Sequence, residues 1–226
     1  MYRRIISFVA AFLLLASGSD VAAQWSVGAR WGKSYTTISR YNAGRMDESY
    51  SALDGINGGI QGRYSFNSWL AVRANLEIMQ RSHRMDRNLN YLDQVFTDHI
   101  NTYLTLPVMA DFSFGGKHLR GHLLAGGYGG YWLRERRLGT TFWMTDYYVY
   151  FENFDEVREF NDSDIRFNAG LSAGAAISYT YSEILELGLE AIYYYDLTSH
   201  HKGYPHLVDP RYLNTFSITF NIYYNL

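Results

Sequence analysis

The chain has 226 residues, a formal net charge of −2 and no cysteine. The mild charge gives no reason to expect a nucleic-acid partner, and the lack of cysteine excludes disulfides, cysteine metal ligands and a lipid anchor on cysteine. Aromatic residues make up 17% of the chain, with 21 tyrosines against only 3 prolines. This balance is typical of all-β proteins.

The first 23 residues have the features of a secretory signal peptide. An apolar run at residues 5–16 follows two arginines and precedes the small-residue motif "VAA" at residues 21–23. Because the run is well short of the roughly 20 residues that a spanning helix needs, we expect cleavage before Gln24 and export of residues 24–226 as one domain.

Segments that alternate between apolar and polar residues with a period of two predict β-strands along the rest of the chain. In chain order, they are residues 24–35, 55–66, 68–80, 99–112, 120–134, 164–179, 183–197 and 214–226. The fifth, "RGHLLAGGYGGYWLR", is so rich in glycine that the alternation does not tell which face is which.

The connections between these segments alternate in length. Long polar connections at residues 36–54, 81–98, 135–163 and 198–213 alternate with short ones at 67, 113–119 and 180–182. An up-and-down meander with all long loops at one end is the arrangement of an outer-membrane barrel, whereas a soluble sandwich has no reason to segregate its loops. We therefore expect an eight-stranded antiparallel transmembrane β-barrel, closed by pairing of its last strand with its first.

Charged residues occupy the polar faces of the predicted strands. They are Arg30, Arg63, Arg73, Glu77, Asp111, Arg166, Glu186 and Glu190. An arginine on the lipid face near mid-bilayer costs roughly 2–4 kcal/mol, so these faces should point inward. Since an eight-stranded barrel is just wide enough to be filled by side chains, we expect these residues to form a network that plugs the interior.

A soluble, lipocalin-like barrel with the apolar face around a ligand is the alternative for this alternation. Two features favour the membrane. Many segments approach the 9–11 residues that a tilted strand needs to cross a bilayer, and aromatic residues cluster near the short turns and the chain end, as in an interfacial girdle. These aromatic residues are Trp25, Tyr64, Phe66, Trp69, Phe112, Phe114, Tyr179, Tyr181 and Tyr224.

Four stretches carry a resemblance to a known family. They are "YLTLPVMADFSFGG", "HLLAGGYGGYWL", "FNAGLSAGAAISY" and "LELGLEAIYYYDL". They resemble the PorT-like outer-membrane β-barrel domain family of Bacteroidota, in which a strand with an apolar-Pro step, here Leu106-Pro107, precedes a short turn and a glycine-rich strand. The resemblance covers residues 24–226 and implies a barrel type but no chemistry. The strand 214–226 also looks like the insertion signal that barrel-assembly machinery reads, which makes this machinery an expected partner beside the outer-membrane lipid.

Three places could carry further function. The loop "TDYYVYFENFDEVREFNDSD" is acidic and rich in tyrosine: it is either a binding loop or a solvated hairpin, and we favour the hairpin. Its acidic residues are Asp146, Glu152, Asp155, Glu156, Glu159, Asp162 and Asp164.

His200, His201 and His206 lie in one polar loop without a fixed carboxylate partner, which is a weak pattern for a metal site. A lipid-modifying barrel enzyme would need a histidine, a serine and an acid at the rim. His99, His122, Ser172 and Glu190 are available, but no spacing singles out a triad. The sequence therefore predicts a non-catalytic outer-membrane protein without a cofactor, with a structural or interaction role and no known protein partner.

Overall fold

The computed structural model describes residues 24–40, 48–87, 95–162, 164–199 and 211–226. The predicted signal peptide and the three loop histidines lie outside these residues. The described residues form nine strands: β1 (Gln24–Arg40), β2 (Glu48–Ser65), β3 (Leu70–Arg87), β4 (Phe96–Gly115), β5 (Leu119–Met144), β6 (Val149–Arg158), β7 (Phe167–Ser182), β8 (Leu185–Asp196) and β9 (Arg211–Asn225). No helix in this part of the chain is long and apolar enough to span a membrane.

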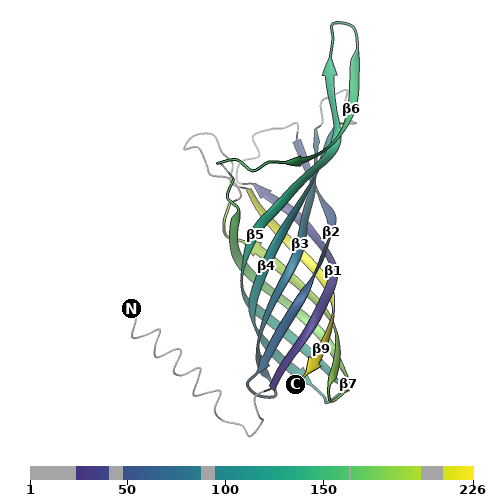
Figure 1. The fold of residues 1–226 in the computed structure, drawn as a ribbon. Helices are drawn as coiled ribbons and strands as arrows, with labels where there is room; N and C mark the ends of the chain where they lie inside the picture. The colour runs from purple at the N-terminus through teal and green to yellow at the C-terminus, as the bar shows by residue number, and fades with distance from the viewer. Residues whose placement is uncertain (1–23, 41–47, 88–94, 163, 200–210) are drawn as a thin grey trace, which may run out of the picture.

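Eight of the strands close into a ring in which every pair is antiparallel. The order is β1–β2–β3–β4–β5–β7–β8–β9, and β9 returns to β1, where Ser26 lies opposite Asn225 and Arg40 opposite Arg211. The ring confirms the predicted all-β, eight-stranded antiparallel barrel. β6 stands outside the ring and pairs only with the upper part of β5 (Figure 1).

Three short turns and the chain's last residue lie at one end of the barrel (Figure 1). The turns join β2 to β3, β4 to β5 and β7 to β8 through residues 66–69, 116–118 and 183–184. In the β4–β5 turn, Gly115 has φ of 123°, in the left-handed region that favours glycine. The remaining connections lie at the opposite end, where the β5–β6 hairpin rises beyond the ring.

The strands are longer than the predicted segments. β1 reaches Arg40 and β2 begins at Glu48, so most of the predicted first long loop is paired strand, and β5 runs for 26 residues. Beyond the bilayer, water lies on both faces of a strand, so a paired strand there does not need an apolar face. The alternation that marks the strands therefore stops before the strands do.

The side chains divide cleanly between the two faces of the wall. Ile60 and Leu189 point outward with 64% and 58% of their surface exposed, whereas Arg73 and Glu190 are each 1% exposed inside. The apolar face thus points outward, which is the reverse of a lipocalin-like barrel. The predicted girdle aromatics Trp25, Trp69, Phe112, Phe114, Tyr179, Tyr181 and Tyr224 are likewise exposed at the short-turn end.

The glycine-rich β5 places large apolar side chains inside the barrel. Leu124 and Tyr128 pack against Met79, Ile192 and Tyr194 in a buried layer across the interior. Because β5 carries apolar residues on both faces, its period-2 pattern is obscured in the sequence. The interior is therefore not uniformly polar, as the strand patterns predicted, but polar with an apolar layer.

Candidate functional site

The centre of the interior is a charged cluster built from four strands. Glu190 on β8 lies between two arginines: Arg30 Nη2 is 3.1 Å from its Oε1, and Arg73 Nη1 contacts its Oε2. Arg30 also lies 3.3 Å from Glu77, and Arg73 lies 2.5 Å from Asp111. Each arginine thus has two carboxylates around it, which compensates the cost of burying its charge.

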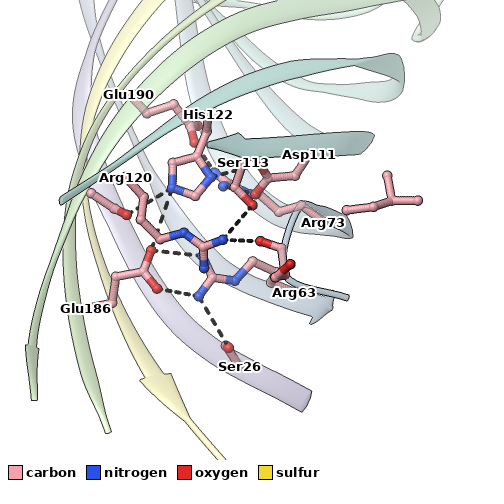
Figure 2. A network of polar contacts seen from close by, with 12 residues as sticks. Ser26, Arg63, Arg73, Asp111, Ser113, Arg120, His122, Glu186 and Glu190 are labelled. Carbon is pink, nitrogen blue, oxygen red and sulfur yellow. Dashed lines mark hydrogen bonds and ion pairs between the residues drawn. The ribbon is translucent and has the colours of Figure 1, made fainter. Parts of the chain in front are cut away.

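A second ion pair lies nearer the short turns (Figure 2). Arg63 Nη1 donates to Glu186 Oε1 at 2.9 Å, and its guanidinium carbon lies 4.5 Å from the centre of the Tyr223 ring. The pair is connected to the central cluster through His122, whose Nε2 is 4.0 Å from Glu186 Oε1 and whose Nδ1 is 2.8 Å from Asp111 Oδ1.

His122 also has a serine partner. Its Nε2 lies 2.9 Å from Ser178 Oγ, so Asp111, His122 and Ser178 form a hydrogen-bonded line inside the barrel. Ser178 is only 4% exposed, and its hydroxyl also hydrogen-bonds Glu186. The serine considered from the sequence, Ser172, is buried on the same strand but is not joined to His122.

A third layer lies toward the outer end and was missed by the sequence analysis. Arg81 Nη1 is 2.9 Å from Asp196 Oδ1, and Tyr128 also donates to this carboxylate. The Arg81 guanidinium carbon lies 5.2 Å from the centre of the Tyr103 ring. The signal was present, because Arg81 and Asp196 continue the inward alternation of β3 and β8 just past the predicted inner positions.

Seven of the eight charged residues predicted for the interior meet in this network. They are Arg30, Arg63, Arg73, Glu77, Asp111, Glu186 and Glu190. Arg166 does not join it. It precedes the first residue of β7, its Nε donates to the Trp132 carbonyl at 3.1 Å, and its guanidinium lies over the rings of Tyr131 and Phe160. The strand begins later than predicted, so Arg166 belongs to the connection near the outer rim.

Glu135 organises the outer rim, beyond the membrane-spanning part of β5. Its carboxylate contacts His99 Nδ1 at 2.9 Å, Arg137 Nε at 2.6 Å and Arg158 Nη1 at 2.9 Å. Burial alone would raise the pKa of Glu135, but these hydrogen bonds outweigh it and hold the pKa at about 2. Since His99 lies at this rim and His122 near the short turns, the two histidines considered as catalytic candidates are at opposite ends of the barrel.

The β5–β6 hairpin extends outward from this rim (Figure 1). Its two strands carry exposed aromatic side chains, with the rings of Trp143 and Tyr150 stacked 4.3 Å apart. Tyr147 at the tip is 88% exposed. Near the base, Arg136 and Asp155 form an exposed ion pair. The hairpin is the form we favoured for the acidic loop.

Metal-binding chemistry finds little support in the described residues. No group of three or more His, Asp or Glu side chains there could hold a metal ion. His200, His201 and His206 fall outside the described part of the chain.

An apolar outer belt, an interior filled by paired charges and a closed antiparallel ring together define an integral outer-membrane β-barrel. The chain belongs to the outer membrane protein beta-barrel domain family, whose profile matches residues 17–202. Its location is the outer membrane. No curated protein sequence matches the chain.

Three solved structures illustrate the shared fold. OprG of Pseudomonas aeruginosa is 10% identical with a TM-score of 0.53, over 91% of this chain and 96% of that one. Ail of Yersinia pestis is 12% identical with a TM-score of 0.43, over 90% and 99%. Outer membrane protein W of E. coli is 12% identical with a TM-score of 0.40, over 89% and 99%. At these identities the similarity concerns the fold alone.

Proposed function

We propose that the protein is a non-catalytic outer-membrane barrel whose interior is a structural plug and whose β5–β6 hairpin is a contact surface outside the cell. One observation carries this proposal: the charged side chains of the interior are engaged with one another, whereas exposed aromatic side chains gather on the hairpin. An interior occupied by its own ion pairs leaves the outer hairpin as the surface for partners.

Narrower placements belong to the same proposal. We place the chain in the PorT-like branch of Bacteroidota barrels, since the Leu106-Pro107 step lies on β4 and is followed by a short turn and the glycine-rich β5. We also propose that β9 is read by barrel-assembly machinery, because its alternating outward residues Phe216, Ile218, Phe220 and Tyr224 end the chain beside β1. The signal peptide at residues 1–23 stays a prediction.

Two measurements test the proposal. Unboiled protein from the outer-membrane fraction should migrate faster on a gel than boiled protein, as closed barrels do. Protease added to intact cells should cut within the hairpin, and the purified protein should give no steady ion conductance in a planar bilayer. A stable conducting pore would contradict the plug, and an uncut hairpin in intact cells would contradict the external contact surface.

A lipid-modifying enzyme is the second candidate, favoured by the line of Asp111, His122 and Ser178. This line has the order of groups of a serine hydrolase. Its serine, however, is buried in the interior beside Glu186 and faces neither the lipid nor the outer rim. Hydrolysis of phospholipid vesicles that Ser178→Ala abolishes would establish the enzyme. A Ser178→Ala protein that changes only in stability fits the plug.

A further inference from the structure

We propose that the outer edge of β6 binds a basic, extended segment of a partner protein, which adds to the hairpin as a further strand. This inference rests on the proposed external position of the hairpin and names the chemistry of its partner.

The first support is the open edge of β6. In the sheet order β6 is the terminal strand, and within the described residues it pairs only with β5, from Glu135 opposite Arg158 to Met144 opposite Val149. Its other edge therefore offers unpaired N–H and C=O groups over ten residues, or roughly 30 Å. Such an edge is a template for pairing with another chain. The strand "VYFENFDEVR" has neither lysine nor proline, the residues that usually protect an edge.

The second support is the apolar surface beside this edge. Side chains on both faces of the hairpin are exposed, and the rings of Trp143 and Tyr150 stack across its two strands. The exposed apolar and aromatic residues are Trp143, Met144, Tyr147, Tyr148, Val149, Tyr150, Phe151 and Val157. The hairpin rises away from the ring, so the lipid belt does not cover it (Figure 1). Exposed apolar surface of this kind marks an interaction site.

Charge selects the occupant. Residues 138–157 contain no lysine, arginine or histidine, but include Asp146, Glu152, Asp155 and Glu156. Arg136 pairs with Asp155, whereas the other three carboxylates have no ion-pair partner in the described part of the chain. Arginine and lysine side chains on an added strand would pair with these carboxylates and lie over the aromatic rings.

A second copy of the chain fits this edge poorly. Two β6 strands paired antiparallel in full register would set Glu152 of one copy opposite Asp155 of the other. Like charges directly opposite each other destabilise a strand pair. The same acidic surface disfavours anionic lipid headgroups, so a basic protein segment is the occupant that matches both the edge and the charge.

The experiment measures peptide binding to the full chain in detergent. The probe is a fluorescent ten-residue peptide of alternating lysine and valine, and fluorescence anisotropy gives the dissociation constant. Three comparison peptides replace lysine with glutamate, or carry N-methyl groups on the amides of one edge or of the other. We expect binding of the lysine peptide, no binding of the glutamate peptide, and a loss of at least tenfold when the edge that faces β6 is methylated.

Variants of the protein localise the site. Glu152→Lys combined with Glu156→Lys should weaken binding of the lysine peptide at least tenfold, while Glu183→Lys in the β7–β8 turn makes the same chemical change at the other end and should leave binding unchanged. Heat-modifiable mobility of each variant shows that the barrel is intact. Equal binding of both N-methylated peptides, an unaffected double variant, or self-association in place of peptide binding would each overturn the inference.

The two proposals fail in different ways. If protease added to intact cells does not cut the hairpin, the external contact surface itself is wrong. If protease cuts the hairpin but the lysine peptide does not bind, the external position stands and the strand-addition inference is wrong.

Discussion

Arg63 and Glu186 join the two strands that flank the closing seam of the barrel. Arg63 Nη1 donates to Glu186 Oε1 at 2.9 Å, from β2 on one side of the β1–β9 pair to β8 on the other. The ion pair therefore spans the seam from inside, and the central cluster around Glu190 repeats this arrangement with Arg30 of β1 and Arg73 of β3. The interior network thus holds together the strands that must meet last.

Removing the shared carboxylate should strongly destabilise the barrel. In Glu190→Ala, Arg30 and Arg73 each lose one of two buried carboxylates. We expect the free energy of unfolding to fall by about 3–5 kcal/mol, the usual effect of breaking a buried ion pair. Urea unfolding in lipid vesicles measures it, with Glu156→Ala in the exposed hairpin as control. Equal stability of the two variants would contradict the role of the cluster.

The seam pair should show the difference between breaking and replacing a buried ion pair. Arg63→Met and Glu186→Leu as single changes each leave a buried charge without its main partner, and should cost more than the double change. The double variant fills the same space with apolar side chains, so we expect most of the lost stability to return. Unfolding midpoints of the four proteins in the same vesicles decide this, and strictly additive effects would argue against the pairing.

The outward face should reject charge. Leu189 is 58% exposed on the wall, so Leu189→Arg should cost roughly 2–4 kcal/mol and reduce assembly in the membrane. Ser172→Ala, a small change inside, should assemble normally. The amount of heat-modifiable protein in the outer-membrane fraction reports both. Normal assembly of Leu189→Arg would reverse the assignment of the two faces.

The outer rim should weaken in acid because of Glu135. Its pKa of about 2 lies below the ordinary 4.5, so its stabilising effect is complete above pH 4.5 and disappears as the pH falls toward 2. The wild type should therefore be more stable than Glu135→Gln at neutral pH, and this difference should shrink over that range. Thermal unfolding of both proteins across this pH range tests it. A difference that does not change with pH would show that the carboxylate is not held in its charged form.

The sequence predicts the barrel and most of its inner charges for a simple physical reason. Between lipid and a filled interior, each position such as Arg73 or Leu189 has only one tolerable side, so the alternation is strict. This constraint ends where water reaches both faces. The upper parts of β1, β2 and β5, and the whole of β6, therefore leave no period-2 pattern.

Other features depend on which strands meet across the interior. That His122 contacts Ser178 and not Ser172 follows from the register of β5 and β7, which no single segment contains. The apolar layer around Tyr128 and Ile192 likewise combines residues from several strands. Arg166 was misplaced because β7 begins one residue later, at Phe167, and the side chain turns to the rim.

The pairing of β1 with β9 also sets the order in which the protein can be made. Ser26 meets Asn225, 199 residues further along the chain. The first strand to leave the export machinery must therefore wait, with one edge unpaired, until almost the whole chain has arrived. Contacts so distant in sequence form slowly, and an unpaired edge invites aggregation in the meantime. Delivery to the membrane thus requires that the chain be kept open in transit, and a truncation that removes only β9 should leave a chain that cells degrade.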